Sequence, residues 1–198
     1  MVRHSATMVS MSDAPAPILV VSGPSGAGKT TVGRLVAAAF DPSVHIRIDD
    51  FMRFVVNGLV DPWVPDSAHQ NHVLGGAVTA AALQFAEGGY TMVLDGHMFP
   101  DGLKGLKHWS ERRGVPLHYA VLRPDLATCL TRVEQQRPGE PENLESFARL
   151  HARFTDLGDR EANVFEATEK PEEVAAVVLG AFSSGRLRVF VPPLELDG

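Results

Sequence analysis

Short apolar runs alternate along the chain with longer stretches in which apolar residues recur every three or four positions. The runs are typical of buried strands, and the longer stretches are typical of helices packed on a sheet. Strands are predicted at 18–21, 44–48, 90–94, 117–122 and 163–165. Helices are predicted at 29–40, 67–87, 102–113, 124–136, 144–157 and 171–183. This alternation favours an α/β domain with a parallel sheet and helices on both faces.

The same pattern predicts one domain with two flanking segments. Residues 1–16 are rich in Ser, Ala, Met and Pro without an apolar signal-peptide core, so we expect a flexible N-terminal tail. Residues 17–185 form the predicted domain, and 186–198 form a C-terminal extension in which 186–191 could add a short strand. No stretch approaches the ~20 apolar residues that span a bilayer. We therefore expect a cytoplasmic protein that does not bind membranes.

The turn between the first predicted strand and helix carries a phosphate-binding motif. Residues 23–30 read Gly-Pro-Ser-Gly-Ala-Gly-Lys-Thr, a complete G-x-x-x-x-G-K-[ST] pattern. Glycines let the backbone wrap around an anion, and the following helix N-terminus adds partial positive charge. Lys29 is expected to reach the β/γ-phosphates, and the Thr30 hydroxyl to ligate Mg²⁺. The nucleotide-binding residues expected here are Gly23, Ser25, Gly26, Ala27, Gly28, Lys29, Thr30 and Thr31.

The net charge limits the classes of binding partner, and the cysteine content limits disulfide formation. The formal net charge of −6 and the pI of about 5.7 argue against a general nucleic-acid surface. The single cysteine, Cys129, lies in an apolar helical pattern and is expected to be a small packing residue. An internal disulfide is excluded.

Carboxylates follow two of the predicted strands. Asp49 and Asp50 come after strand 44–48, at the edge of the sheet where parallel strands end. We expect at least one of them to act in the chemistry, while the other could cap a short helix through 51–56. Asp95 follows the next strand, where it could orient Mg²⁺ or its water. A structural Asp-Gly turn is the alternative for Asp95.

Basic and aromatic residues near the predicted turns are further candidates. Arg132 and Arg137 precede the turn 138–141, and an arginine there could close on a triphosphate and offset developing charge. The alternative is that these arginines are solvated charges on a helix, and this alternative is stronger for Arg132 than for Arg137. His97 could face the phosphate acceptor, and Trp63 could overhang the ligand edge of the sheet or plug the base of its loop.

Two arginines on the predicted helix 144–157 are interpreted as structural. Arg149 and Arg153 lie one turn apart and are expected to be solvated or paired with Glu145.

Taken together, these motifs resemble the small P-loop kinases of the chloramphenicol phosphotransferase, shikimate kinase and gluconate kinase group, and look closest to chloramphenicol-phosphotransferase-like proteins. The resemblance covers about 17–185 and rests on 23–31, on Ile48-Asp49-Asp50-Phe51, on Val93-Leu94-Asp95-Gly96 and on Arg123, Arg132 and Arg137. It implies a three-layer fold with a five-stranded parallel sheet of order 2-3-1-4-5 and a small lid. It also implies ATP with Mg²⁺, and a small-molecule hydroxyl as acceptor.

In such kinases the Asp just after the second strand is the acceptor-side base, so the resemblance implies Asp49 in that role, beside Lys29 and Arg137 as catalytic residues. Shikimate-kinase-like members carry Asp-x-Asp there, but Arg47 stands two positions before Asp49. The expected metal ligands are therefore Thr30 and Asp95. Arg132 and the loop 168–171, with Thr168, are expected to contact the nucleotide.

The leading functional hypothesis is an ATP-dependent kinase of a small metabolite or antibiotic, acting as a monomer or homodimer. A nucleotide-binding regulatory NTPase and a zeta-toxin-like nucleotide-sugar kinase remain alternatives. A guanine-specifying Asn-Lys-x-Asp pattern is missing, which favours ATP over GTP. The acidic charge disfavours a polynucleotide kinase. The middle of the chain lacks an acceptor-binding motif, so chloramphenicol is only one candidate acceptor.

Overall fold

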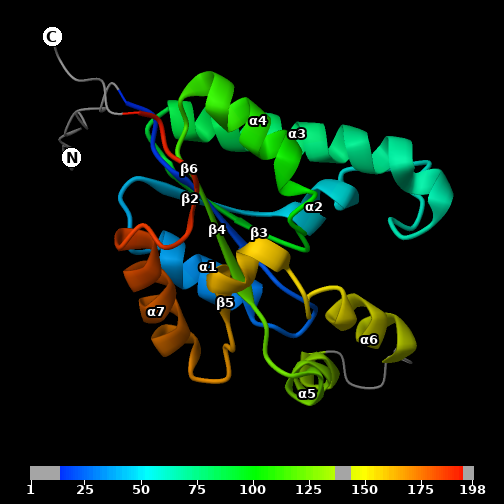
Figure 1. Ribbon diagram of the computed structural model, residues 1–198. Coiled ribbons are helices and arrows are strands. Elements are labelled where there is room, and N and C mark those ends of the chain that lie inside the picture. The colour runs from blue at the N-terminus through cyan, green and yellow to red at the C-terminus, as the bar shows by residue number, and fades with distance from the viewer. Residues whose placement is uncertain (1–13, 137–143, 194–198) are drawn as a thin grey trace, which may run out of the picture.

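A twisted sheet lies between two sets of helices in the computed structural model, which describes residues 14–136 and 144–193 (Figure 1). The strands are β1 (Ile18–Ser22), β2 (Ser43–Arg47), β3 (Thr91–Asp95), β4 (Leu117–Leu122), β5 (Val164–Phe165) and β6 (Arg188–Phe190). The helices are α1 (Lys29–Ala37), α2 (Ile48–Arg53), α3 (Ala68–Glu87), α4 (Leu103–Arg113), α5 (Leu126–Gln136), α6 (Leu144–Ala152) and α7 (Pro171–Ser183). Two 3₁₀ turns, η1 (Pro65–Ser67) and η2 (Gly158–Asn163), complete the connections.

The strand order is β2-β3-β1-β4-β5, with these neighbours parallel, which confirms the predicted order 2-3-1-4-5. Val21 of β1 pairs with Asp95 of β3, and Arg47 of β2 pairs with the same aspartate. The carboxyl ends of β1, β2 and β3 therefore meet at one edge of the sheet. This register brings the phosphate-loop motif and the acidic residues together.

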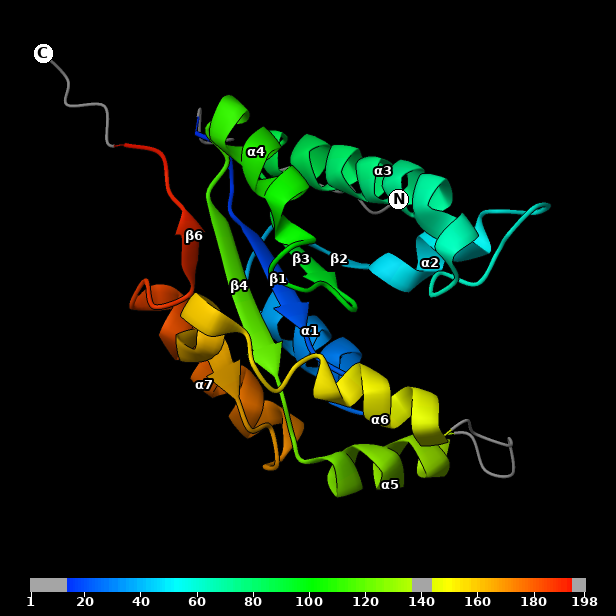
Figure 2. The same cartoon turned by 45° about the vertical axis from the view of Figure 1, so that its right-hand side comes forward.

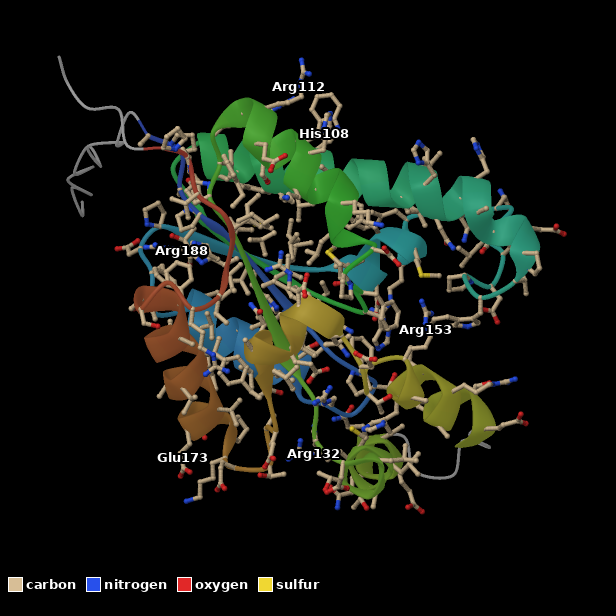
Figure 3. All side chains as sticks on the ribbon, viewed as in Figure 1. His108, Arg112, Arg132, Arg153, Glu173 and Arg188 are labelled. Carbon is tan, nitrogen blue, oxygen red and sulfur yellow. The ribbon has the colours of Figure 1, made fainter. Side chains whose placement is uncertain are left out.

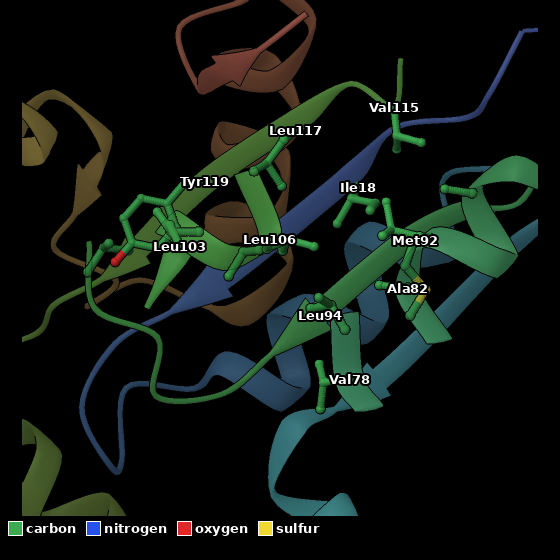
Figure 4. Close-up of a cluster of buried hydrophobic side chains, with 14 of the residues drawn as sticks. Ile18, Val78, Ala82, Met92, Leu94, Leu103, Leu106, Val115, Leu117 and Tyr119 are labelled. Atoms are coloured by element: carbon green, nitrogen blue, oxygen red, sulfur yellow. The ribbon is translucent and has the colours of Figure 1, made fainter. Parts of the chain in front are cut away.

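The core consists of two hydrophobic clusters, one on each face of the sheet. Alternate residues of β1 feed them: Ile18 and Val20 point to one face, and Leu19 and Val21 point to the other. The first cluster packs under α3 and α4 (Figure 4), and the second packs under α1 and α7. These four apolar side chains of β1 are fully buried. Burial of each such aliphatic side chain stabilises the fold by roughly 1.5–3 kcal/mol.

Several predicted boundaries differ from the structure by one or more residues, and two of these differences have a clear structural reason. Ile48 does not end β2 but begins α2, and a Cβ at Gly96 would lie only 2.7 Å from its Cβ, so the glycine makes room for this turn. The helix predicted at 144–157 ends at Ala152. Phe154, fully buried in the first cluster, is accommodated by a turn rather than by a further helical turn.

The flanking segments are described only in part. Residues 1–13, most of the predicted flexible tail, lie outside the described residues, while the backbone N–H of Ala16 donates to Ala86 O at 2.9 Å. The predicted short strand in the C-terminal extension is present as β6, which pairs antiparallel with β4. No helix within the described residues combines the length and apolar character needed to cross a membrane.

Candidate nucleotide and acceptor site

The loop between β1 and α1 has the conformation that its glycines allow. Gly23, Gly26 and Gly28 all have positive φ. A Cβ at Gly23 would lie 2.1 Å from Leu122 O, and one at Gly26 would lie 2.2 Å from Cys129 O. Any larger residue would therefore push the loop off the backbone of β4 and α5. Gly28 faces open space and is the N-cap of α1, so this helix directs its N-terminus toward the loop.

Lys29 reaches back over this loop. Its Nζ donates a 2.8 Å hydrogen bond to Pro24 O, and the residue is only 9% exposed. Burial lowers the pKa of Lys29 to about 8, although the charges of Asp49 and Asp95 oppose this shift. The ammonium group thus lies near two carboxylates, and a further anion beside it would raise its pKa.

Asp95 accepts hydrogen bonds on both carboxylate oxygens. Thr30 Oγ1 donates to Oδ1 at 3.1 Å, and His45 Nε2 lies 2.6 Å from Oδ2. Because an ionised carboxylate can only accept, this ring nitrogen carries the proton. Asp95 is 3% exposed. The side chains of α1, β2 and β3 are therefore joined around one buried carboxylate.

The two neighbouring aspartates of α2 have different surroundings. Asp50 forms ion pairs with Arg47 at 3.8 Å and Arg53 at 3.3 Å. Asp49 faces the cavities beside the phosphate loop instead. The predicted capping role is wrong for both, because Arg47 is the N-cap of α2 and both aspartates lie in its first turn. Carboxylates in a first turn favour the helix dipole.

Two adjoining cavities open at the carboxyl edge of the sheet. Figure 2 shows α2 and α6 on opposite sides of this edge. The smaller, of about 180 Å³, is lined by Ser25, Gly26, Gly28, Lys29, Thr30, Thr31, Asp49, Asp95, His97, Val133, Gln136 and Phe147. The larger, of about 690 Å³, is lined by Ser25, Asp49, Met52, Pro62, Trp63, His97, Ser146, Phe147, Arg149, Leu150 and Arg153. Ser25, Asp49, His97 and Phe147 belong to both. The phosphate loop thus faces one cavity, and a second space opens directly beyond it.

His97 stands at the boundary of the two cavities. Its Nε2 lies 3.4 Å from Ser25 Oγ, and its ring centroid lies 6.5 Å from that of Trp63. Burial, and then the charges of Lys29 and Arg153, lower the pKa of His97 to about 3. The imidazole is therefore neutral near pH 7 and can serve as a hydrogen-bond partner but not as a cation. Trp63 is 63% exposed and lines the larger cavity, so it overhangs the ligand edge rather than plugging its loop.

Other candidates lie farther from the cavities. Arg132, labelled in Figure 3, donates to Ala167 O at 3.1 Å and so braces the loop that carries the exposed Thr168. Neither residue lines the two cavities. Arg123 donates from Nη1 and Nη2 to the two carboxylate oxygens of Glu161, and we interpret it as structural. Arg137 and the predicted lid turn 138–141 lie outside the described residues.

The structure also identifies site residues that the sequence analysis missed. His45 is one, and its only signal was a polar residue between two apolar residues of a predicted strand. Phe147 and Gln136 line the smaller cavity from α6 and α5, where no motif marked them. The predicted pair of Arg149 with Glu145 is confirmed at 3.6 Å, whereas Arg153 contacts the Phe99 ring.

Known structures share this fold at low identity. The tunicamycin resistance protein of Deinococcus radiodurans has a TM-score of 0.61 and 18% identity over 90% of this chain and 99% of that one. A sugar kinase from Janibacter sp. HTCC2649 has a TM-score of 0.64 and 18% identity over 85% and 95%. The Mycobacterium tuberculosis APS kinase CysC, in complex with AMPPNP and APS, has a TM-score of 0.62 and 16% identity over 86% and 99%.

No curated protein matches the sequence significantly. A family model described as an AAA domain, AAA_33, matches residues 18–157, which is more than half of the chain. The phosphate loop, the strand order and this match agree, and the chain belongs to the AAA domain family AAA_33 with the fold of P-loop kinases.

Proposed function

We propose that this protein is an ATP-dependent kinase that transfers the γ-phosphate of ATP to a hydroxyl group of a small molecule. The observation that carries the proposal is the position of Asp49, which lines both the cavity of the phosphate loop and the larger cavity beside it. A carboxylate at that boundary faces the place where a phosphate donor and an acceptor would meet. The kinases among the structures with this fold support the same reading.

The nucleotide phosphates would lie in the smaller cavity. The loop amides, the N-terminus of α1 and the ammonium of Lys29 all favour anions there. The Thr30 hydroxyl and the Asp95 carboxylate are oxygen donors of the kind that Mg²⁺ prefers, so they fit a magnesium ion. When bound, that ion would neutralise charge on the transferring phosphate. We propose that Arg132 and Thr168 border the adenine, with Arg132 acting through the loop it braces.

In the transfer step, the acceptor oxygen forms a bond to the γ-phosphorus while the bond from that phosphorus to the bridging oxygen of ADP breaks. Asp49 accepts the proton that leaves the hydroxyl. His97 and Ser25, at the same boundary, can hold the acceptor hydroxyl by hydrogen bonds. Arg137 remains our candidate for the residue that offsets the charge developing on the phosphate.

The proposal is tested by incubating the protein with ATP, Mg²⁺ and a panel of hydroxylated compounds, and by measuring the mass of each compound. The panel includes tunicamycin, monosaccharides, hydroxy acids, UDP-sugars and chloramphenicol. We expect at least one compound to gain a single phosphoryl group, and we expect Asp49→Asn to lose this activity. Steady ATP hydrolysis with no phosphorylated compound would support the regulatory NTPase instead.

A further inference from the structure

Arg153 reaches the larger cavity with its donors unused. Its guanidinium carbon lies 3.7 Å from the centroid of the Phe99 ring, and the residue is exposed. Within the described ranges, no hydrogen bond or ion pair involves its side chain. Stacking on a ring uses the face of the guanidinium plane and leaves the N–H groups at its edge free for oxygen acceptors. Figure 3 shows this side chain on the side of α6 that faces α2.

The charges around this cavity are unevenly placed. Arg149 and Arg153 stand on the α6 side, and Asp49 of α2 is the one carboxylate among the lining residues. Arg149 is paired with Glu145, but both side chains are mostly exposed and such a pair is weak. Neither arginine lines the smaller cavity, where the nucleotide phosphates would lie. Their positive charge would therefore act on a ligand in the larger cavity.

The remaining lining is mainly apolar. Met52, Pro62, Trp63, Phe147 and Leu150 surround the space, whose volume of about 690 Å³ is in the range of small-molecule sites. A neutral polyhydroxyl ligand would offer no apolar surface to this lining and no negative charge to the arginines. A ligand with an apolar or ring-shaped body and one anionic end would match both.

We propose that the larger cavity is a binding site for an anionic acceptor, whose carboxylate or phosphate group is held by the edge of Arg153. The body of this acceptor packs against Trp63 and Phe147. Its hydroxyl lies at Asp49, a placement that rests on the proposed kinase function, whereas the anion site at Arg153 does not.

Binding is measured through the fluorescence of Trp63 in a Trp109→Phe background, which leaves one of the two tryptophans of the chain. The probes are matched pairs: 3-phenyllactate and 3-phenylpropane-1,2-diol, gluconate and glucitol, phenyl phosphate and phenol. We expect at least one anionic member to bind about tenfold or more tightly than its neutral partner, because charge-assisted hydrogen bonds are the stronger kind. Comparison of the carboxylates with the phosphate identifies the preferred anion.

Two variants test whether Arg153 causes the preference for anionic ligands. Arg153→Gln should bring the affinity for that anion down to that of its neutral partner and leave ATP affinity unchanged. Arg34→Gln, at an exposed arginine of α1 that lines neither cavity, is the matched control and should keep the preference. Saturable binding without a preference, no binding of any anion, or a loss of ATP affinity in Arg153→Gln with the preference retained would each overturn the inference.

The phosphoryl-transfer assay separates this inference from the proposed function. Phosphorylation of neutral acceptors alone, with no preference for anions, would leave a kinase and overturn the anion site. Anion binding that depends on Arg153, with no transfer from ATP to any hydroxyl compound, would leave the site and overturn the kinase.

Discussion

His45 Nε2 and Asp95 Oδ2 lie 2.6 Å apart, and this hydrogen bond connects the second strand to the buried carboxylate beside the phosphate loop. A Cβ on Gly33 would approach the same Nε2 to 3.0 Å, so a larger residue there would crowd the imidazole. Since Thr30 occupies the other oxygen of Asp95, the histidine and the threonine together set the orientation of the carboxylate. His45 is therefore expected to position Asp95 rather than to contact the reactants.

Replacing His45 by alanine should leave Asp95 with one hydrogen-bond donor fewer. We expect about a tenfold lower kcat and a higher Mg²⁺ concentration at half-maximal rate, with KM for ATP nearly unchanged. Loss of the partner of the buried Oδ2, while Thr30 still donates to Oδ1, should also cost about 1–3 kcal/mol of unfolding free energy. Magnesium titrations of the transfer rate and urea unfolding measure these effects. His69→Ala, at an exposed histidine of α3, is the control, and equal magnesium dependence in both variants would contradict the positioning role.

Lys29→Ala should remove most nucleotide affinity, because the substitution deletes the one ammonium group held beside the loop. In the wild-type protein, ATP affinity should fall as the pH rises through about 8, because Lys29 of the nucleotide-free protein loses its proton there. Bound phosphates favour the charged lysine, so binding near pH 8.5 should take up protons. Calorimetry in two buffers of different ionisation enthalpy detects this uptake. Lys170→Ala, at an exposed lysine, should behave as wild type, and a Lys29→Ala protein that binds ATP normally would refute the phosphate-loop assignment.

Asp49→Asn keeps the size of the side chain but cannot accept the acceptor proton. We expect it to retain ATP affinity and stability and to lose roughly 10²-fold in transfer rate. Asp50→Asn should slow transfer less, because Asp50 is engaged with Arg47 and Arg53. Single-turnover rates with an accepted hydroxyl compound give the comparison. A larger loss of transfer rate in Asp50→Asn would mean that Asp50, not Asp49, accepts the proton. An unchanged rate in both variants would mean that neither aspartate acts as a general base.

His97 should make the folded protein sensitive to acid. Its pKa is about 3 in the folded protein, against an ordinary value of 6.5 in the unfolded chain. Between these pH values the unfolded chain binds more protons, so the free energy of unfolding decreases as the pH is lowered. His97→Gln should reduce the loss of stability between pH 7 and pH 4.5 by about 2 kcal/mol. His118, whose pKa is lowered to about 4, contributes equally in both proteins, so urea unfolding of the two at both pH values isolates His97.

Features contained in one contiguous stretch were predictable from the sequence. The phosphate loop follows from residues 23–30 alone, because its glycines and Lys29 act through the backbone they belong to. Helix α7 was placed correctly by its Pro at the first turn and its apolar spacing. The strand order followed from the resemblance to P-loop kinases, and the sheet confirms it.

The sequence by itself thus determined a parallel α/β fold with an anion-binding loop, and it placed Asp49 and Asp95 at one edge of the sheet. Only the tertiary structure decided which side chains meet there: His45 with Asp95, Arg153 with Phe99, and Asp49 rather than Asp50 at the cavities. The partners in the first two pairs are about fifty residues apart in the chain. Local spacing dictates which face of a strand or helix a residue occupies, but such contacts depend on strand register and on where each helix packs.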